Sequence, residues 1–240
     1  MWDEPEKLTA IANFLFLAVA VAAGWVLMGF ASHLPMLQPK LLRVDGMTDR
    51  LNRDEVVKIA ARRLGTNFFD ADIDGMKRDF EQIPWVRTAS VSRRWPLEID
   101  VRVEEHVPIA KWDGNRMVNT YGEVFDATEQ NALPLFTGPE GSSKDVSREY
   151  LSFSRTLATL DRKVVEVNLS DRRSWEIRLD NGMLIELGRE KMEKRLSDFA
   201  ALYARTVGSL GGRVDYVDLR YENGFAVRAP GLKLRTRGAA

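Results

Sequence analysis

The residues most suggestive of chemistry lie in the stretch from Asp70 to Glu81, which reads DADIDGMKRDFE. It fits the calcium-loop pattern D-x-D-x-D-G-x5-E, in which alternate carboxylates gather around a hard cation. Lys77 and Arg78 bring two positive charges into this loop, and Met76 and Phe80 recur at helical spacing. We therefore predict a helix whose first carboxylates cap free N–H groups, and no metal site.

No other group of side chains forms a catalytic set. The two histidines, His33 and His106, are far apart in sequence, and the chain has no cysteine. Zinc and phosphate motifs are missing from the sequence, so we expect no catalytic residue and no cofactor. An envelope enzyme that uses carboxylates alone stays an open alternative, since only the fold can bring a pair together. The formal net charge is zero, and no basic block indicates nucleic acid.

The elements that position these residues begin with an uncharged stretch, Leu8–Ser32. A helix of about 20 apolar residues spans a bilayer, so we predict a membrane helix at 8–32. The alternative is a signal peptide cleaved near Ala20-Val21-Ala22. However, the apolar run continues to Phe30 and the leader Met1–Lys7 is acidic, which favours an uncleaved anchor.

Local charge leaves the orientation of this anchor open. Lys7 alone precedes the helix, whereas Lys40, Arg43 and Arg50 follow it. Basic residues favour the cytoplasmic side, which would keep the large part inside, but long domains can cross regardless.

The segment 42–106 has the pattern strand, helix, helix, strand, strand, which predicts a small α+β layer. Asn52 and Glu55 resemble a capping box at the first helix start. Residues 97–103 alternate apolar and charged side chains, typical of a strand with one buried face and one wet face that includes Asp100. The helical positions, which we expect to be buried, are Val56, Ile59, Ala60, Leu64, Ile73, Met76 and Phe80.

The segment 107–230 is β-rich with helices. We predict a loop at Pro134–Ser143, a helix from Asp145, a second helix through Met192–Tyr203, and a last hairpin with arms Val214–Tyr221 and Phe225–Arg228. The other predicted strands are Ile109–Trp112, Met117-Val118, Val124-Phe125, Val164–Leu169, Trp175–Leu179 and Met183–Leu187.

An ordered series of motifs in this chain resembles the FtsQ/DivIB family of bacterial cell-division proteins. The motifs are Asn67-Phe68-Phe69, Pro84-Trp85-Val86 and Arg93-Arg94-Trp95-Pro96, and we expect Phe68, Phe69 and Trp85 to be core residues. The resemblance implies a cytoplasmic tail at 1–7, a linker at 33–41, a POTRA domain (βααββ) at 42–106, a mixed β domain with helices at 107–230 and a tail at 231–240. The short, acidic segment 1–7 departs from the basic tail that is common in this family.

The same resemblance implies a non-enzymatic scaffold of the division machinery, anchored in the inner membrane with its bulk in the periplasm and enriched at the septum. It implies binding of the single-span proteins FtsB and FtsL, with other division proteins as candidates for the POTRA domain. The partner-binding residues carried over from the family are Tyr221, Asn223, Phe225, Val227 and Arg172.

An unpaired terminal strand agrees with this interpretation, because it offers main-chain groups to an incoming strand. One alternative places Phe225 and Val227 in the core, with the edge covered by Gly231–Ala240. Another alternative for the whole chain is a POTRA-bearing component of envelope secretion or assembly.

Overall fold

The computed structural model describes residues 5–32, 41–46, 50–51, 53–65, 68–129, 131–210 and 212–230. The chain divides into two compact units, residues 1–105 and 106–240. Asn52, Asn67, His33 and the tail 231–240 lie outside the described residues, so the capping box and the covered edge stay predictions. The finer domain limits given above also stay predictions.

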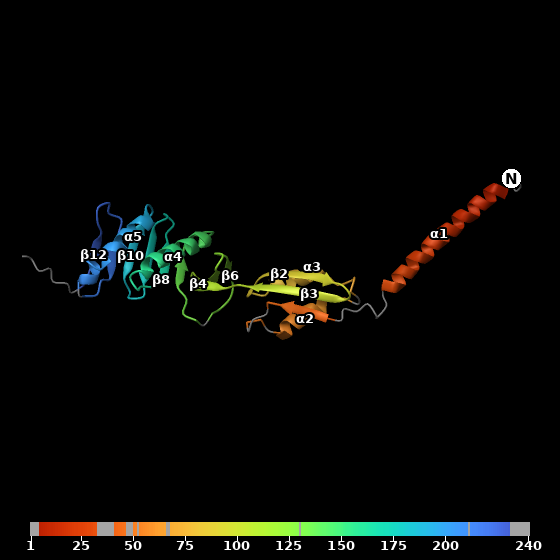
Figure 1. The fold of residues 1–240 in the computed structure, drawn as a ribbon, viewed down its shortest axis with the longest axis horizontal. Coiled ribbons are helices and arrows are strands. Elements are labelled where there is room, and N and C mark those ends of the chain that lie inside the picture. The colour runs from red at the N-terminus through yellow and green to blue at the C-terminus, as the bar shows by residue number, and fades with distance from the viewer. Residues whose placement is uncertain are drawn as a thin grey trace, which may run out of the picture. The chain divides into compact units, whose positions relative to one another are not determined.

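The first element is the long helix α1 (Pro5–Ser32) (Figure 1). Its stretch Thr9–Leu27 is long and apolar enough to cross a membrane. The large side chains described along it, such as Phe16 and Trp25, are exposed. This is the arrangement expected of a helix covered by lipid, where the backbone bonds are satisfied within the helix.

The first sheet has three strands, in the order β1-β3-β2. Strand β1 is parallel to β3, and β2 is antiparallel to β3. The element order confirms the predicted α+β layer. Its elements are β1 (Leu41–Asp45), α2 (Arg53–Arg63), α3 (Ile73–Glu81), β2 (Val86–Arg94) and β3 (Glu98–Glu105).

Both helices contribute apolar side chains to the core of this sheet. Val56 and Ile59 of α2 and Met76 and Phe80 of α3 are buried in one cluster with Val101. The apolar faces of the two helices and of the sheet therefore pack against each other in one layer, as the sequence predicts.

Three side chains of the first unit differ from the sequence-based expectation. Asp100, on the face that the sequence predicts to be wet, is buried between its cross-strand neighbours Arg43 and Ser92. Its Oδ2 lies 3.4 Å from Arg102 Nε. Phe68 is buried as expected, whereas Phe69 is 62% exposed and does not belong to the core. Trp85 is only half-buried and does not belong to the core cluster that the sequence predicts for it; the Arg50 guanidinium lies 4.5 Å from its ring centre.

The second sheet has nine strands, in the order β12-β11-β10-β9-β8-β7-β4-β5-β6. Strand β10 pairs with β11 in parallel, so the last hairpin joins the sheet through a crossover over α5. The strands are β4 (Pro108–Trp112), β5 (Arg116–Asn119), β6 (Val124–Phe125), β7 (Leu135–Thr137), β8 (Val164–Leu169), β9 (Trp175–Leu179), β10 (Leu184–Gly188), β11 (Tyr216–Asp218) and β12 (Ala226–Arg228).

Strand β7 lies where the sequence predicts only a loop. Three residues inside the Gly-, Pro- and Ser-rich stretch 134–143 pair in parallel with β8, and the first two of them also pair in parallel with β4. Phe136 at its centre is fully buried, which explains why so short a strand joins the two halves of the sheet.

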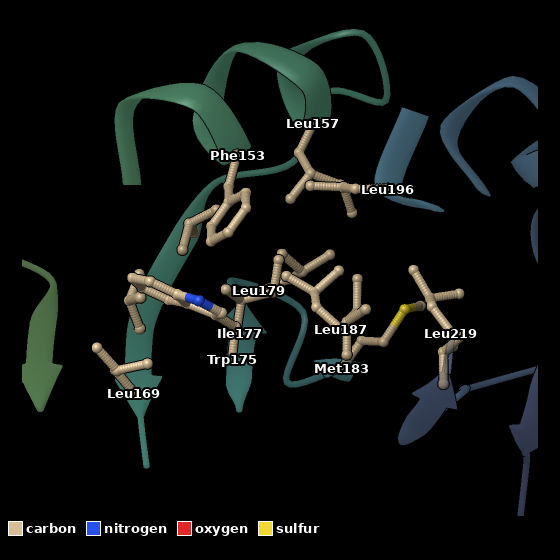
Figure 2. Packing of buried hydrophobic residues seen from close by; sticks show 14 of the residues in the cluster. Phe153, Leu157, Leu169, Trp175, Ile177, Leu179, Met183, Leu187, Leu196 and Leu219 are labelled. Carbon is tan, nitrogen blue, oxygen red and sulfur yellow. The ribbon is translucent and has the colours of Figure 1, made fainter. Parts of the chain in front are cut away.

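The helices α4 (Ser143–Ala158) and α5 (Met192–Tyr203) pack beside each other, and a 3₁₀ helix, η2 (Val207–Ser209), follows α5. Figure 2 shows Phe153 and Leu157 of α4 and Leu196 of α5 pointing toward the strand residues Trp175 and Ile177. These residues belong to one continuous buried cluster. The second unit is thus one sheet with a helical layer on one face.

Candidate partner-binding site

Strand β12 is the outermost strand at one end of the nine-stranded sheet. It pairs with β11 on one side only, in the register Tyr216 to Arg228, Val217 to Val227 and Asp218 to Ala226. All three of its residues are exposed. Within the described part of the chain no strand pairs with its outer side, which is the kind of edge that an incoming strand can extend.

Alternate residues along β12 line a groove beside η2. Phe225, Val227 and Ala229 form one wall, and the segment 205–210 forms the other, around a volume of about 480 Å³. Val227 is 38% exposed. On the opposite face, the Arg228 guanidinium lies 5.3 Å from the ring centre of Tyr216. An added strand would therefore have apolar groups to contact on the helical side only.

A second groove, of about 400 Å³, lies between α5 and the turn that precedes β12. Tyr221, Asn223 and Phe225 line it together with α5 residues that include Phe199. The rings of Phe225 and Phe199 meet edge to face, with centres 5.4 Å apart. Phe225 is half-buried and lines both grooves. The turn and the strand therefore form one continuous surface.

The structure thus brings four of the five predicted residues together. Tyr221 and Asn223 are exposed in the turn, Phe225 directly precedes β12, and Val227 lies on it. We call the surface formed by residues 221–229 the β12 edge. Whether it binds a partner stays a prediction.

Arg172 lies apart from the β12 edge. It is exposed in the turn between β8 and β9, at the same end of the sheet as the turn after β11. Strand β10 lies between β9 and β11, so Arg172 belongs to the rim of any contact made at the β12 edge.

Sequence reasoning missed the residue that fixes the end of β11. Arg220 donates from Nε to Asp218 Oδ1 at 2.9 Å and from Nη2 to Asp218 Oδ2 at 2.7 Å. Its Nη1 lies 3.1 Å from Glu186 Oε1 of β10. These hydrogen bonds lower the pKa of the Asp218 carboxyl below its usual range and raise the pKa of Arg220. The only signal in the sequence is the spacing Asp218-Leu219-Arg220.

This ion pair determines where the turn of the β12 edge begins. Asp218 is almost fully buried, and a bidentate guanidinium pair holds a fixed geometry. Gly188, with φ of +78°, makes room for Arg220, because a Cβ there would lie 3.0 Å from Arg220 Cγ. Tyr221 therefore follows directly on a residue that is tied to β10 and β11.

The calcium-loop stretch is helical from Ile73 onward, as predicted. Asp72 caps α3 by accepting a hydrogen bond from Gly75 N at 2.9 Å, and a Cβ at position 75 would collide with that carboxylate. Arg63 pairs with Asp72 at 3.1 Å and with Asp79 at 2.8 Å, which lowers the pKa of Asp79. These carboxylates serve a helix start and an ion pair, while the absence of a bound metal stays a prediction.

The fold places this chain in the class of proteins that carry an apolar N-terminal helix ahead of two units of mixed helices and strands. A single apolar helix precedes a small α+β domain and a large sheet that ends in an accessible strand. A family model described as POTRA domain, FtsQ-type, matches residues 38–106. A model described as cell division protein FtsQ/DivIB, C-terminal, matches residues 110–220.

Curated relatives agree along nearly the whole chain. The cell division protein FtsQ of Nitrosospira multiformis is 38% identical over 95% of this chain and 99% of its own length. The FtsQ protein of Burkholderia pseudomallei is 38% identical over 98% of this chain and 97% of its own, and that of Escherichia coli is 33% identical over 91% and 84%. The chain therefore belongs to the FtsQ/DivIB family of cell division proteins, and this membership supports a role in the division machinery.

Proposed function

We propose that this protein is a non-enzymatic scaffold that binds FtsB- and FtsL-like single-span proteins by adding a partner strand to the β12 edge. It thereby recruits septal cell-wall synthesis proteins. The observation that carries the proposal is the exposed outer strand β12, flanked by a largely apolar groove beside η2 and a groove of mixed polarity beside α5. Family membership supports the division context.

The physics of strand addition fits this surface. Main-chain hydrogen bonds provide affinity, and alternate side chains provide specificity. Because β12 has only three residues, main-chain bonds alone contribute little, at about 1 kcal/mol net for each. The partner must therefore bury apolar side chains against Phe225 and Val227, where about 25 cal/mol is gained per Å² of apolar surface.

The single histidine among the described residues, His106, makes structural contacts. His106 is buried, its ring stacks on Phe125 with centres 4.0 Å apart, and its Nδ1 lies 2.8 Å from Asn119 Nδ2. This arrangement supports a scaffold rather than a hydrolase.

A pair of proline variants tests strand addition in the full chain. Consecutive N–H groups of a strand point to opposite edges, so one of Ala226→Pro and Val227→Pro removes an outward donor. That variant is expected to keep its melting temperature and to capture FtsB ten- to a hundredfold more weakly, which corresponds to about 1.4–2.8 kcal/mol. Proline at Val124, on the other outer strand, is the matched control and should leave capture unchanged. Capture at the wild-type level by both folded β12 variants would reject the proposal.

We also propose that the part of the chain after α1 lies in the periplasm and gathers at the septum. Local charge leans the other way, but long domains translocate largely regardless of it. Protease added to spheroplasts should digest both units. Survival of the C-terminal unit, while a known periplasmic domain is degraded, would contradict this orientation.

A further inference from the structure

Two large aromatic side chains lie exposed at one end of the first sheet. Trp95, in the turn between β2 and β3, is 87% exposed, and Phe69 is 62% exposed. Trp95 combines a large apolar body with a polar N–H, which suits a boundary between water and an apolar phase. Single exposed apolar residues are common, so their placement decides what they mean.

Arg93 ties the two aromatic residues to the same end of the domain. From β2 it donates to Phe68 O at 3.2 Å, to Phe69 O at 3.2 Å and to Ala71 O at 2.8 Å. The loop that carries Phe69 is thereby held against the strand end that leads into Trp95. We call Phe69, Trp95 and the neighbouring Arg93 and Arg94 the aromatic tip.

The chain enters the domain at this tip. Strand β1 begins at Leu41, which lies opposite Glu98, three residues after Trp95. Helix α1 ends at Ser32, so eight residues separate it from β1. Because an extended chain spans at most about 3.5 Å per residue, Leu41 lies within about 30 Å of the end of α1. The opposite end of β3, at Glu105, is where the chain leaves the domain.

We propose that the aromatic tip rests in the headgroup layer of the same bilayer that α1 spans. Trp is enriched at membrane interfaces, and Arg near an anionic surface is attracted to its lipids. Arg94 faces Glu98 across the strand pair, and this carboxylate offsets its charge. The aromatic side chains therefore contribute more to membrane binding than Arg94 does. The proposal rests on α1 crossing the membrane. It gives the domain a second attachment, which restricts its tilt above the bilayer.

The lack of cysteine makes a direct test possible. Single spin labels are placed in the full chain, reconstituted in phosphatidylcholine vesicles, at Arg94→Cys in the tip, Thr88→Cys toward the other end of β2 and Leu17→Cys in α1. Collision rates with oxygen, which enters the bilayer, are compared with those of a water-soluble nickel chelate. The ratio is expected to be highest at Leu17, intermediate at Arg94 and lowest at Thr88.

A background variant separates membrane contact from mere proximity. In Phe69→Ala/Trp95→Ala protein the Arg94 label is expected to fall to the ratio of the Thr88 label, with an unchanged melting temperature because both side chains are exposed. The three label variants that keep Phe69 and Trp95 are also measured in vesicles that contain phosphatidylglycerol. Membrane contact of the aromatic tip should rise there by about fivefold at most, because one basic side chain near an anionic surface contributes about that much.

An Arg94 label as water-accessible as the Thr88 label in both lipid mixtures, with Leu17 shielded, would overturn this inference alone. A water-accessible Leu17 label would overturn membrane anchoring and this inference together. Partner capture at the β12 edge is measured separately, so its failure is distinguishable from either result.

Discussion

The two outer strands of the nine-stranded sheet, β6 and β12, differ in what covers them. Each is two or three residues long and pairs on one side among the described residues. Phe125 of β6 is only 8% exposed and stacks on His106. The three residues of β12 are all exposed, and a largely apolar groove lies beside them.

Polar contacts complete the closed end of the sheet. Asn119 Nδ2 lies 2.8 Å from both His106 Nδ1 and Glu123 Oε2, and its Oδ1 accepts hydrogen bonds from Tyr121 N and Glu123 N. Asn119 is fully buried and has its donors and acceptors satisfied. An outer strand is therefore a candidate binding site only when its side chains, as well as its backbone, remain accessible.

The largest expected effect comes from replacing Phe125 of β6, or Phe225 directly before β12, with alanine. Phe125→Ala should lower the free energy of unfolding of the second unit by about 3 kcal/mol, since it empties a packed site. Phe225→Ala should cost about 1 kcal/mol of stability, because its ring is half-buried, and should weaken partner capture more strongly. Denaturant unfolding and capture are measured on both variants. Weakened capture by a stably folded Phe125→Ala protein would remove the distinction between the two ends.

The ion pair behind the β12 edge should give the next largest effect. Asp218→Asn is expected to lower the free energy of unfolding by about 2 kcal/mol at pH 7, since hydrogen bonds to a charged group contribute about 1.5–3 kcal/mol. Because the pKa of Asp218 is depressed in the folded state, its contribution is complete above the ordinary carboxyl pKa of about 4. It is lost as the pH falls through the folded pKa.

Unfolding of wild type and Asp218→Asn as a function of pH checks this sign. The difference between them should shrink below about pH 4, where the unfolded carboxyl is protonated. Asp113→Asn serves as a control, because Asp113 is an exposed carboxylate with a 3.7 Å pair to Arg116. A difference that grows toward acid pH would show that the Asp218 and Arg220 pair does not stabilise the folded state.

A charge placed on the open strand should reduce binding with little effect on folding. Val227→Lys is expected to weaken FtsB capture about tenfold, about 1.4 kcal/mol, since lysine on an outer strand opposes strand addition. Val227 is already partly exposed, so the melting temperature should stay close to that of wild type. Val124→Lys, on the half-buried β6, should instead lower the melting temperature and spare capture.

The smallest expected effect is at Arg172. Its place in the β8–β9 turn makes it a rim charge, so Arg172→Ala should change the association rate with FtsB by about two- to threefold, and less at high salt. Association kinetics at two salt concentrations measure this. A loss larger than that of Val227→Lys would move the centre of the contact from β12 toward β8 and β9.

Elements whose side chains follow a clear period could be predicted from the sequence. The uncharged stretch at 8–32 predicts α1, and the alternation at 97–103 predicts β3, because a strand or helix with one buried face imposes its own spacing. The helix over the calcium-like motif was also predictable, since Met76 and Phe80 need a common face. The ordered motifs made the family assignment possible before any geometry was known.

Which regions are covered depends on contacts between elements that are distant in sequence. Strand β7 is too short for a period to appear, and its strand conformation comes from pairing with β4 and β8. Asp100 is buried between residues of β1 and β2 although it lies on the polar face of β3, and Phe69 is exposed at the aromatic tip. The contrast between β6 and β12 has the same origin: burial depends on neighbours distant in sequence, which local spacing does not encode.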